Sequence, residues 1–133
     1  MDKQTLRQYR KIVAKIADLS AERAMIYGLR FPGTDGERVS SSTTSDPTMR
    51  AAEALDRIDA VLADKIAEMV DLRIEIERVI DALPPDDYRL MHLRYIEGNT
   101  WEQVAVTLGY DYRHTTKKHG KILGRLRENG LMD

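Results

Sequence analysis

A short basic segment near the C-terminus carries the residues best suited to chemistry in this chain. Residues 112–127 contain no acidic residue and six basic ones, namely Arg113, Lys117, Lys118, Lys121, Arg125 and Arg127. The net charge of the whole chain is −1, so the other residues together carry −7. A local cationic segment on an acidic protein is typical of a face that binds a polyanion such as DNA. The alternative is a solvated helix end, because basic residues in a last turn also complement the helix dipole.

Residues suited to catalysis or to metal binding are sparse. The chain has no cysteine and only three scattered histidines, which excludes disulfides and thiolate metal sites and argues against a zinc site. The adjacent Asp86 and Asp87 are interpreted as helix caps, and Glu68, Asp71 and Glu75 as a solvated helix face. We therefore expect no enzyme activity, no cofactor and no metal.

No apolar run approaches the roughly 20 residues that a membrane span needs. The first residues are charged throughout and lack the apolar block of a signal peptide. These two features predict a cytoplasmic protein.

Two helices joined by a tight turn are predicted to position the basic segment. Thr100 and Gln103 have the spacing of a capping box, which predicts a helix that begins at Trp101. Gly109 supplies the positive φ that ends this helix. Asp111 is then predicted to cap the next helix, which carries the basic segment.

Apolar spacing predicts which faces of these helices are buried. The predicted inner residues are Trp101, Val104, Ala105 and Leu108 in the first helix, and Thr115, His119, Ile122 and Leu126 in the second. Ala105 is small enough for the second helix to cross close over it, and overpacking there would cost ~1–3 kcal/mol. A shorter helix over 87–97 precedes them, capped by Asp86, stopped by Gly98, and with three inner residues, Leu90, Leu93 and Ile96.

The first 83 residues are predicted to form an antiparallel helical hairpin. One helix is expected over 2–29, ended by Gly28 and the Pro-Gly-containing run at 31–33. A polar loop is expected over 31–46. The second helix is expected over 47–83, with Pro47 in its first turn and candidate caps at Thr43, Ser45 and Asp46.

The second helix repeats in alternating steps of three and four residues, which is the pattern of a coiled-coil seam. The seam residues are Leu55, Ile58, Leu62, Lys65, Met69, Leu72, Ile76, Val79 and Leu83. Because the first helix is too short to cover this seam, we expect a homodimer through the coiled coil; the alternative is packing against the C-terminal region. Pro84 and Pro85 break the helix, which predicts two domains, 1–83 and 84–133. The predicted class is all-α, a long antiparallel hairpin followed by a compact three-helix helix-turn-helix domain.

The segment Leu93 to Ala105 (LRYIEGNTWEQVA), followed by Leu108-Gly109-Tyr110, resembles region 4 of the sigma-70 family. The continuation through Tyr112-Arg113-His114 and Lys118 to Leu123 is similar to a narrower group, the ArpU/RinA type of late transcription regulators in phages and prophages of Gram-positive bacteria. This resemblance implies a sequence-specific regulator that binds double-stranded DNA in a bacterial host cell. Thr115 and Lys118 depart from the sigma pattern, which usually has apolar residues there, and Gly120 and Gly124 lie within the expected recognition helix.

In helix-turn-helix proteins the second helix reads base edges in the major groove. At 100° per residue, Arg113 and Lys117 lie opposite the inner face and are the predicted base contacts. The other predicted DNA-binding residues are Tyr112, His114 and Thr116 for bases or phosphates, Lys118, Lys121 and Arg125 for phosphates, and Thr100 with the first amides of its helix for a further phosphate.

Two other functions remain open from the residues alone. A small terminase subunit in DNA packaging also combines a helix-turn-helix with an oligomerising helical hairpin. A sigma-like factor would instead contact RNA polymerase through the same module.

Overall fold

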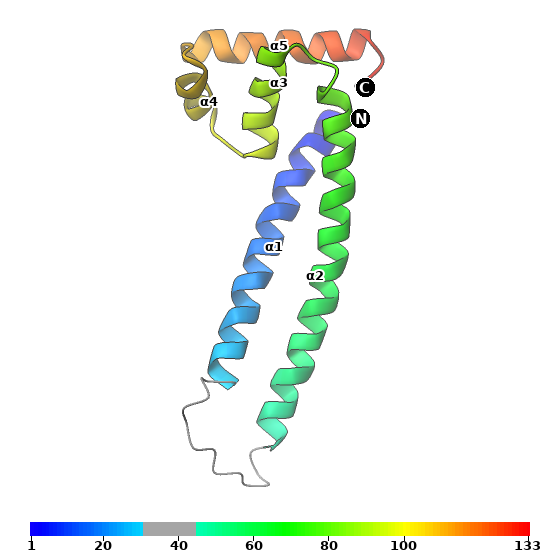
Figure 1. Ribbon diagram of the computed structural model, residues 1–133, viewed down its shortest axis with the longest axis vertical. Helices are drawn as coiled ribbons and strands as arrows, with labels where there is room; N and C mark the ends of the chain where they lie inside the picture. The colour runs from blue at the N-terminus through cyan, green and yellow to red at the C-terminus, as the bar shows by residue number, and fades with distance from the viewer. Residues whose placement is uncertain (31–44) are drawn as a thin grey trace. The chain divides into compact units, whose positions relative to one another are not determined.

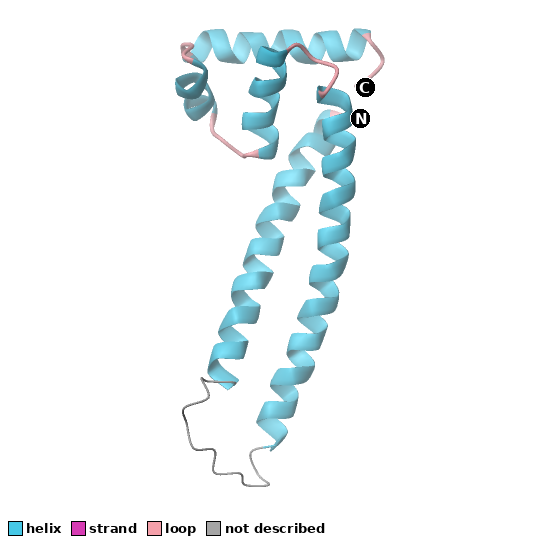
Figure 2. Ribbon diagram, in the orientation of Figure 1, coloured by secondary structure: helices cyan, strands magenta, loops and turns pink. Residues whose placement is uncertain are grey.

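The structure is a computed structural model that describes residues 1–30 and 45–133. All regular secondary structure within these ranges is helical, as Figure 2 shows. In chain order the elements are α1 (Lys3–Arg30), α2 (Ser45–Ile80), α3 (Pro85–Met91), the π-helical turn η2 (His92–Ile96), α4 (Trp101–Leu108) and α5 (Tyr112–Glu128) (Figure 1). The predicted all-α class is confirmed: a long antiparallel pair, α1 and α2, precedes three short packed helices.

The described residues divide into two compact units. One consists of Met1–Ile12 and Met69–Asp133, and the other of Val13–Glu68. Each unit contains a segment of α1 and an antiparallel segment of α2. The predicted domain boundary at Pro84 stays a prediction.

The unit Val13–Glu68 is thinly packed. Leu55 and Leu62 of α2 are buried on the predicted seam, while Ile16 and Leu19 of α1 are only half-buried. An ion pair joins the two helices, with the Nε of Arg23 2.6 Å from Oδ1 of Asp59. Both side chains are exposed, so this pair contributes little to stability.

The larger unit has a continuous apolar core. Leu6 of α1 and Ile76 and Ile80 of α2 are fully buried. The three-helix part contributes residues that are equally well buried, among them Leu90, Met91, Val104, Ile122 and Leu126. Burying a side chain of this size stabilises a fold by about 1.5–3 kcal/mol. The first turns of α1 and the last turns of α2 are therefore part of the same core as α3, α4 and α5.

Polar contacts hold the same parts together. Arg10 of α1 donates through Nη1 to the carbonyl of Ile96, at 2.9 Å. The Tyr88 hydroxyl of α3 donates to Oε2 of Glu77 in α2, at 3.0 Å. Gly98 has a φ of 74°, and a Cβ there would collide with the Arg10 guanidinium. The positive φ favours glycine at 98, whereas the flexible end of the Arg10 side chain would shift to make room for a Cβ.

Several predicted boundaries are corrected. Gly28 lies within α1, which continues to Arg30, and α2 ends at Ile80 rather than Leu83. The Asp86 cap is wrong: Pro84 is the N-cap residue of α3 and no side chain caps this helix. Helix α3 begins earlier because the fixed φ of Pro85 suits the first helical position. Ser45 and Asp46 were predicted to end the loop and to offer caps, but both lie within the first turn of α2. The rest of the predicted loop over 31–46 and the Thr43 cap lie outside the described residues.

The short helix predicted over 87–97 is interrupted. Its last part is π-helical, with the Glu97 amide bonding to the carbonyl of His92 at 3.0 Å. The predicted inner residues Leu90, Leu93 and Ile96 are buried, and so are Met91 and Tyr95. The wider turn rotates successive side chains, which brings both faces of the segment into contact with the core.

Candidate nucleic-acid interface

The start of α4 and the turn between α4 and α5 are set by three local signals that the sequence analysis predicted. The Thr100 hydroxyl accepts from the Gln103 amide at 3.2 Å, and the Gln103 side chain accepts from the Thr100 amide at 2.9 Å. Gly109 has a φ of 74° at the end of α4. Asp111 caps α5 by accepting from the His114 amide at 2.7 Å. These contacts satisfy one free amide in the first turn of each helix, together with the Thr100 amide, and fix where α4 and α5 begin.

The inner face of α5 is the predicted one. Thr115, His119, Ile122 and Leu126 are all buried, together with Leu123, which the analysis did not include. Figure 1 shows α3 and α4 on the same side of α5. The departure from the sigma pattern at Thr115 is accommodated, because its hydroxyl donates to the carbonyl of Asp111 at 2.9 Å. Ala105 is 5% exposed, as its predicted place on the inner face of α4 requires.

His119 is a buried polar residue within this inner face. Its Nε2 lies 2.6 Å from the Tyr95 hydroxyl, and its ring centroid is 4.5 Å from that of Trp101. Burial, reinforced by the positive charges of Lys3 and Arg94, lowers the pKa of His119 to about 4. The imidazole is therefore neutral at physiological pH, and it fills and hydrogen-bonds the core rather than carrying charge.

The opposite face of α5 is open. The predicted contact residues Tyr112, Arg113, His114, Lys117 and Lys121 are all exposed. Within the described part of the chain, Arg113, Lys117 and Lys121 form no ion pair. No described side chain therefore neutralises them through an ion pair.

Two other predicted residues have local hydrogen-bond partners. Thr116 is half-buried, and its hydroxyl donates to the carbonyl of Arg113 at 3.1 Å. The Thr100 hydroxyl belongs to the capping box, so any phosphate at the start of α4 would meet backbone amides first.

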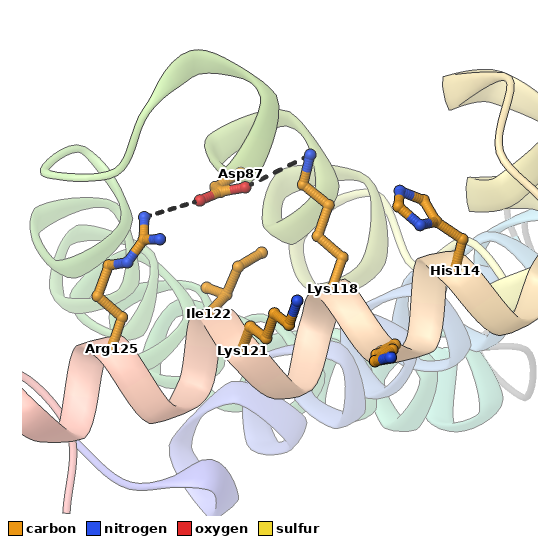
Figure 3. A pocket seen from close by; sticks show the side chains of 7 residues that line it. Asp87, His114, Lys118, Lys121, Ile122 and Arg125 are labelled. Carbon is orange, nitrogen blue, oxygen red and sulfur yellow. Dashed lines mark hydrogen bonds and ion pairs between the residues drawn. The ribbon is translucent and has the colours of Figure 1, made fainter.

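The remaining two predicted residues, Lys118 and Arg125, are ion-paired to Asp87 of α3. The Lys118 Nζ lies 3.6 Å from Oδ1, and the Arg125 Nη1 lies 3.3 Å from Oδ2, as Figure 3 shows. Asp87 is 8% exposed, and a carboxylate so well buried needs such partners. Sequence reasoning missed this role and interpreted Asp87 as a cap. The available signal was the seven-residue spacing of Lys118 and Arg125, which puts both on one side of α5.

Tyr110, in the turn before α5, is a second contact of Lys118, in addition to Asp87. Its hydroxyl accepts from the Lys118 Nζ at 3.3 Å, and its ring centroid lies 5.0 Å from the same atom. The Tyr110 ring also meets the His114 ring edge-on, with centroids 4.6 Å apart. The hydrogen bond to Tyr110 and the charge of Asp87 outweigh burial and raise the pKa of Lys118.

An open pocket of about 340 Å³ runs along this side of α5. It is lined by Asp87, His114, Lys117, Lys118, Lys121, Ile122 and Arg125. Four lysines and arginines face one carboxylate, so the pocket has a positive charge suited to an oxyanion such as a phosphate.

Two features of the described residues bear on other chemistry. They contain no group of three or more histidine, cysteine, aspartate or glutamate residues arranged to hold a metal ion. Every buried side-chain nitrogen and oxygen among them has a hydrogen-bond partner.

None of the described helices combines the length and the apolar character needed to cross a membrane.

Comparison with protein-family models, curated proteins and solved structures yields no match to this chain.

Proposed function

We propose that the protein is a sequence-specific regulator of transcription that binds double-stranded DNA through α5. The observation that carries this proposal is the open face of α5, on which Arg113, Lys117 and Lys121 are exposed and unpaired among the described side chains. A second helix with such a face, set behind a capped turn, is the element that enters the major groove in helix-turn-helix proteins.

The sequence resemblance supports the same function. The segment from Leu93 to Tyr110, which resembles sigma-70 region 4, corresponds to η2, the connection that follows it, α4 and the start of the turn. A late-gene regulator of the phage or prophage type is the specific form of this proposal.

The side chains differ in the roles that we assign to them. Arg113 and Lys117 contact bases, because guanidinium and ammonium groups pair with the guanine acceptors of the major groove. Lys121 binds a phosphate. Lys118 and Arg125 bind phosphates more weakly than Lys121, because Asp87 already neutralises part of their charge.

We further propose a homodimer formed by α1 and α2. On α2, Ile66, Val70 and Ile74 follow one another in four-residue steps and are 44–51% exposed, which is an apolar stripe outside the buried seam. Helix α1 has seven basic and two acidic residues, whereas α2 has five basic and nine acidic ones. This complementarity favours packing of α2 from one copy against α1 of the other.

The DNA-binding proposal is tested by selecting from a randomised duplex library and measuring affinity by fluorescence anisotropy. A dimer that neutralises roughly six phosphates gives a log–log salt slope of about −5. Arg113→Ala should relax sequence preference, whereas Lys121→Ala should weaken binding to all sequences alike. Arg50→Ala, an exposed residue of α2, is the matched control. Failure to enrich any sequence, or a salt-independent interaction, would contradict the proposal.

Sedimentation velocity and native mass spectrometry test the dimer. Val70→Glu should yield monomers, while Val106→Glu, on the exposed side of α4, should leave the dimer intact. A ring of eight or more subunits would instead favour DNA packaging, and retained binding to RNA polymerase without DNA binding would favour a sigma-like factor.

A further inference from the structure

A second basic surface lies beside the predicted reading residues of α5 and is formed by residues of α1 and η2. Two pockets, of about 250 and 210 Å³, share Arg7 of α1, Arg94 of η2 and Tyr95. Lys3 lines one of them and Arg10 the other. Neither pocket has an acidic residue in its lining, so four cationic side chains gather here without a counter-charge.

Two of these four cations have structural roles. Arg10 donates to the carbonyl of Ile96. Arg94 donates to the carbonyl of Asn99 at 2.9 Å and covers the Trp101 ring at 4.7 Å. These contacts hold the segment around the π-helical turn in place. The positions of Arg10 and Arg94 are therefore explained by structural roles, and no ligand is needed to explain them.

No structural contact of this kind explains the positions of Lys3 and Arg7. Both are exposed, and neither forms an ion pair with the residues that the structure describes. Lys3 lies in the first turn of α1, where the helix dipole disfavours positive charge, and Arg7 lies one turn further on. The nearest acidic residue in the sequence, Asp2, is engaged in capping Thr5 at 2.8 Å. Two unpaired cations near this helix end are well placed for an external anion.

This surface adjoins α5. Thr116 and His119 line the same pocket as Lys3 and Arg7, and Trp101 from the start of α4 also lines it. On α5, Thr116 precedes Lys117 and follows Arg113 by three residues. A polyanion that extends along the open face of α5 therefore has a second set of cations beside it, on α1.

We propose that Lys3 and Arg7 bind the sugar–phosphate backbone of the duplex beside the segment contacted by α5. This inference rests on the proposed function and assigns to α1 a part in DNA binding. The contacts are to phosphates, so they add affinity and fix orientation but do not read sequence.

The test compares two double variants of the full-length protein that remove the same charge from the same helix. Lys3→Gln/Arg7→Gln removes the proposed contacts, and Lys11→Gln/Lys15→Gln removes two exposed cations of α1 outside both pockets. DNA affinity is measured against salt concentration, using a duplex selected by the wild type and an unrelated duplex. Circular dichroism and thermal unfolding check that both variants fold, and sedimentation velocity checks that both keep the oligomeric state of the wild type.

We expect the first double variant to weaken binding to both duplexes equally. Its log–log salt slope should be shallower by about 2 per protomer, because each phosphate that is no longer neutralised reduces the slope by roughly 0.9. The control should keep a slope close to that of the wild type. In phosphate-ethylation interference, modification of the phosphates at the flank of the site should cease to impair binding in the first variant only.

Equal slopes and equal interference patterns in the two variants would overturn the role of Lys3 and Arg7 while leaving the proposed function intact. A wild-type protein that binds no duplex would overturn both, so the two failures are distinguishable.

Discussion

The Tyr95 hydroxyl lies 2.6 Å from Nε2 of His119, and both residues are buried. The Tyr95 phenol belongs to η2 and the imidazole to the middle of α5, 24 residues later. We assign the phenol as donor, because the imidazole is neutral and its Nε2 can then accept the proton. This hydrogen bond links the α5 helix to the segment before α4, and it has consequences for stability as a function of pH.

Lowering the pH should destabilise the protein through His119. The histidine protonates near pH 6.5 when unfolded and only at about pH 4 when folded. Between these values the unfolded state binds more protons, so stability is complete above pH 6.5 and falls as the pH decreases towards 4. The decrease should be about 2–3 kcal/mol, measured by urea unfolding at a series of pH values.

His119→Gln is the control for this prediction, since it keeps a hydrogen-bonding side chain but cannot titrate. The stability difference between wild type and variant should shrink as the pH falls from 6.5 to 4. A constant difference across this range would show that the pKa of His119 is the same in the folded and unfolded states.

Leu6→Ala should destabilise the unit that contains α5. Leu6 is fully buried in the core shared by α1, α2 and the three short helices, and removing a buried leucine typically costs about 2–5 kcal/mol. Urea unfolding followed by hydrogen exchange of α5 amides measures the effect. Met25→Ala, at a position 65% exposed, should change stability by less than about 0.5 kcal/mol. Normal α5 protection in the Leu6 variant would contradict the shared core.

Asp87→Asn should increase affinity for every DNA sequence if α5 binds DNA as proposed. The substitution removes the charge that pairs Lys118 and Arg125, so both cations become available to phosphates. The salt slope should steepen by up to about 2 per protomer. Asp86→Asn changes the same charge one residue earlier, at an exposed position, and should have a smaller effect. Unchanged affinity and slope in the Asp87 variant would indicate a purely structural ion pair.

Gly120→Ala should raise the stability of the protein and weaken its binding to DNA. Gly120 is exposed, and a Cβ at this position would meet no atom within 4 Å, so alanine should stabilise α5 by up to about 1 kcal/mol through helix propensity. The same methyl group would stand on the face proposed to enter the groove and should weaken DNA binding. Gly28→Ala, equally open within α1, should raise the melting temperature without affecting DNA. Unimpaired binding by the Gly120 variant would place this part of α5 outside the interface.

The local features could be predicted from the sequence because each is caused by residues that lie within a few positions of one another. The Thr100–Gln103 box, the positive φ of Gly109 and the Asp111 cap each involve neighbours three or four positions apart or a single backbone angle. The same holds for the inner face of α5, since helical periodicity alone selects Thr115 and His119. The Asp86 cap failed because the preference of Pro85 for the first helical position prevailed.

The amino-acid sequence by itself determined the helical class, the turn between α4 and α5, and which side of α5 faces outward, because periodicity and capping act at short range. Only the tertiary structure decided which cations stay unpaired. Asp87 and Arg125 are 38 residues apart, and Arg10 and Ile96 are 86 apart. Such pairs depend on how separate helices pack, a property that no local pattern encodes. The packing withdraws Lys118 and Arg125 towards Asp87 and brings Lys3 and Arg7 beside α5.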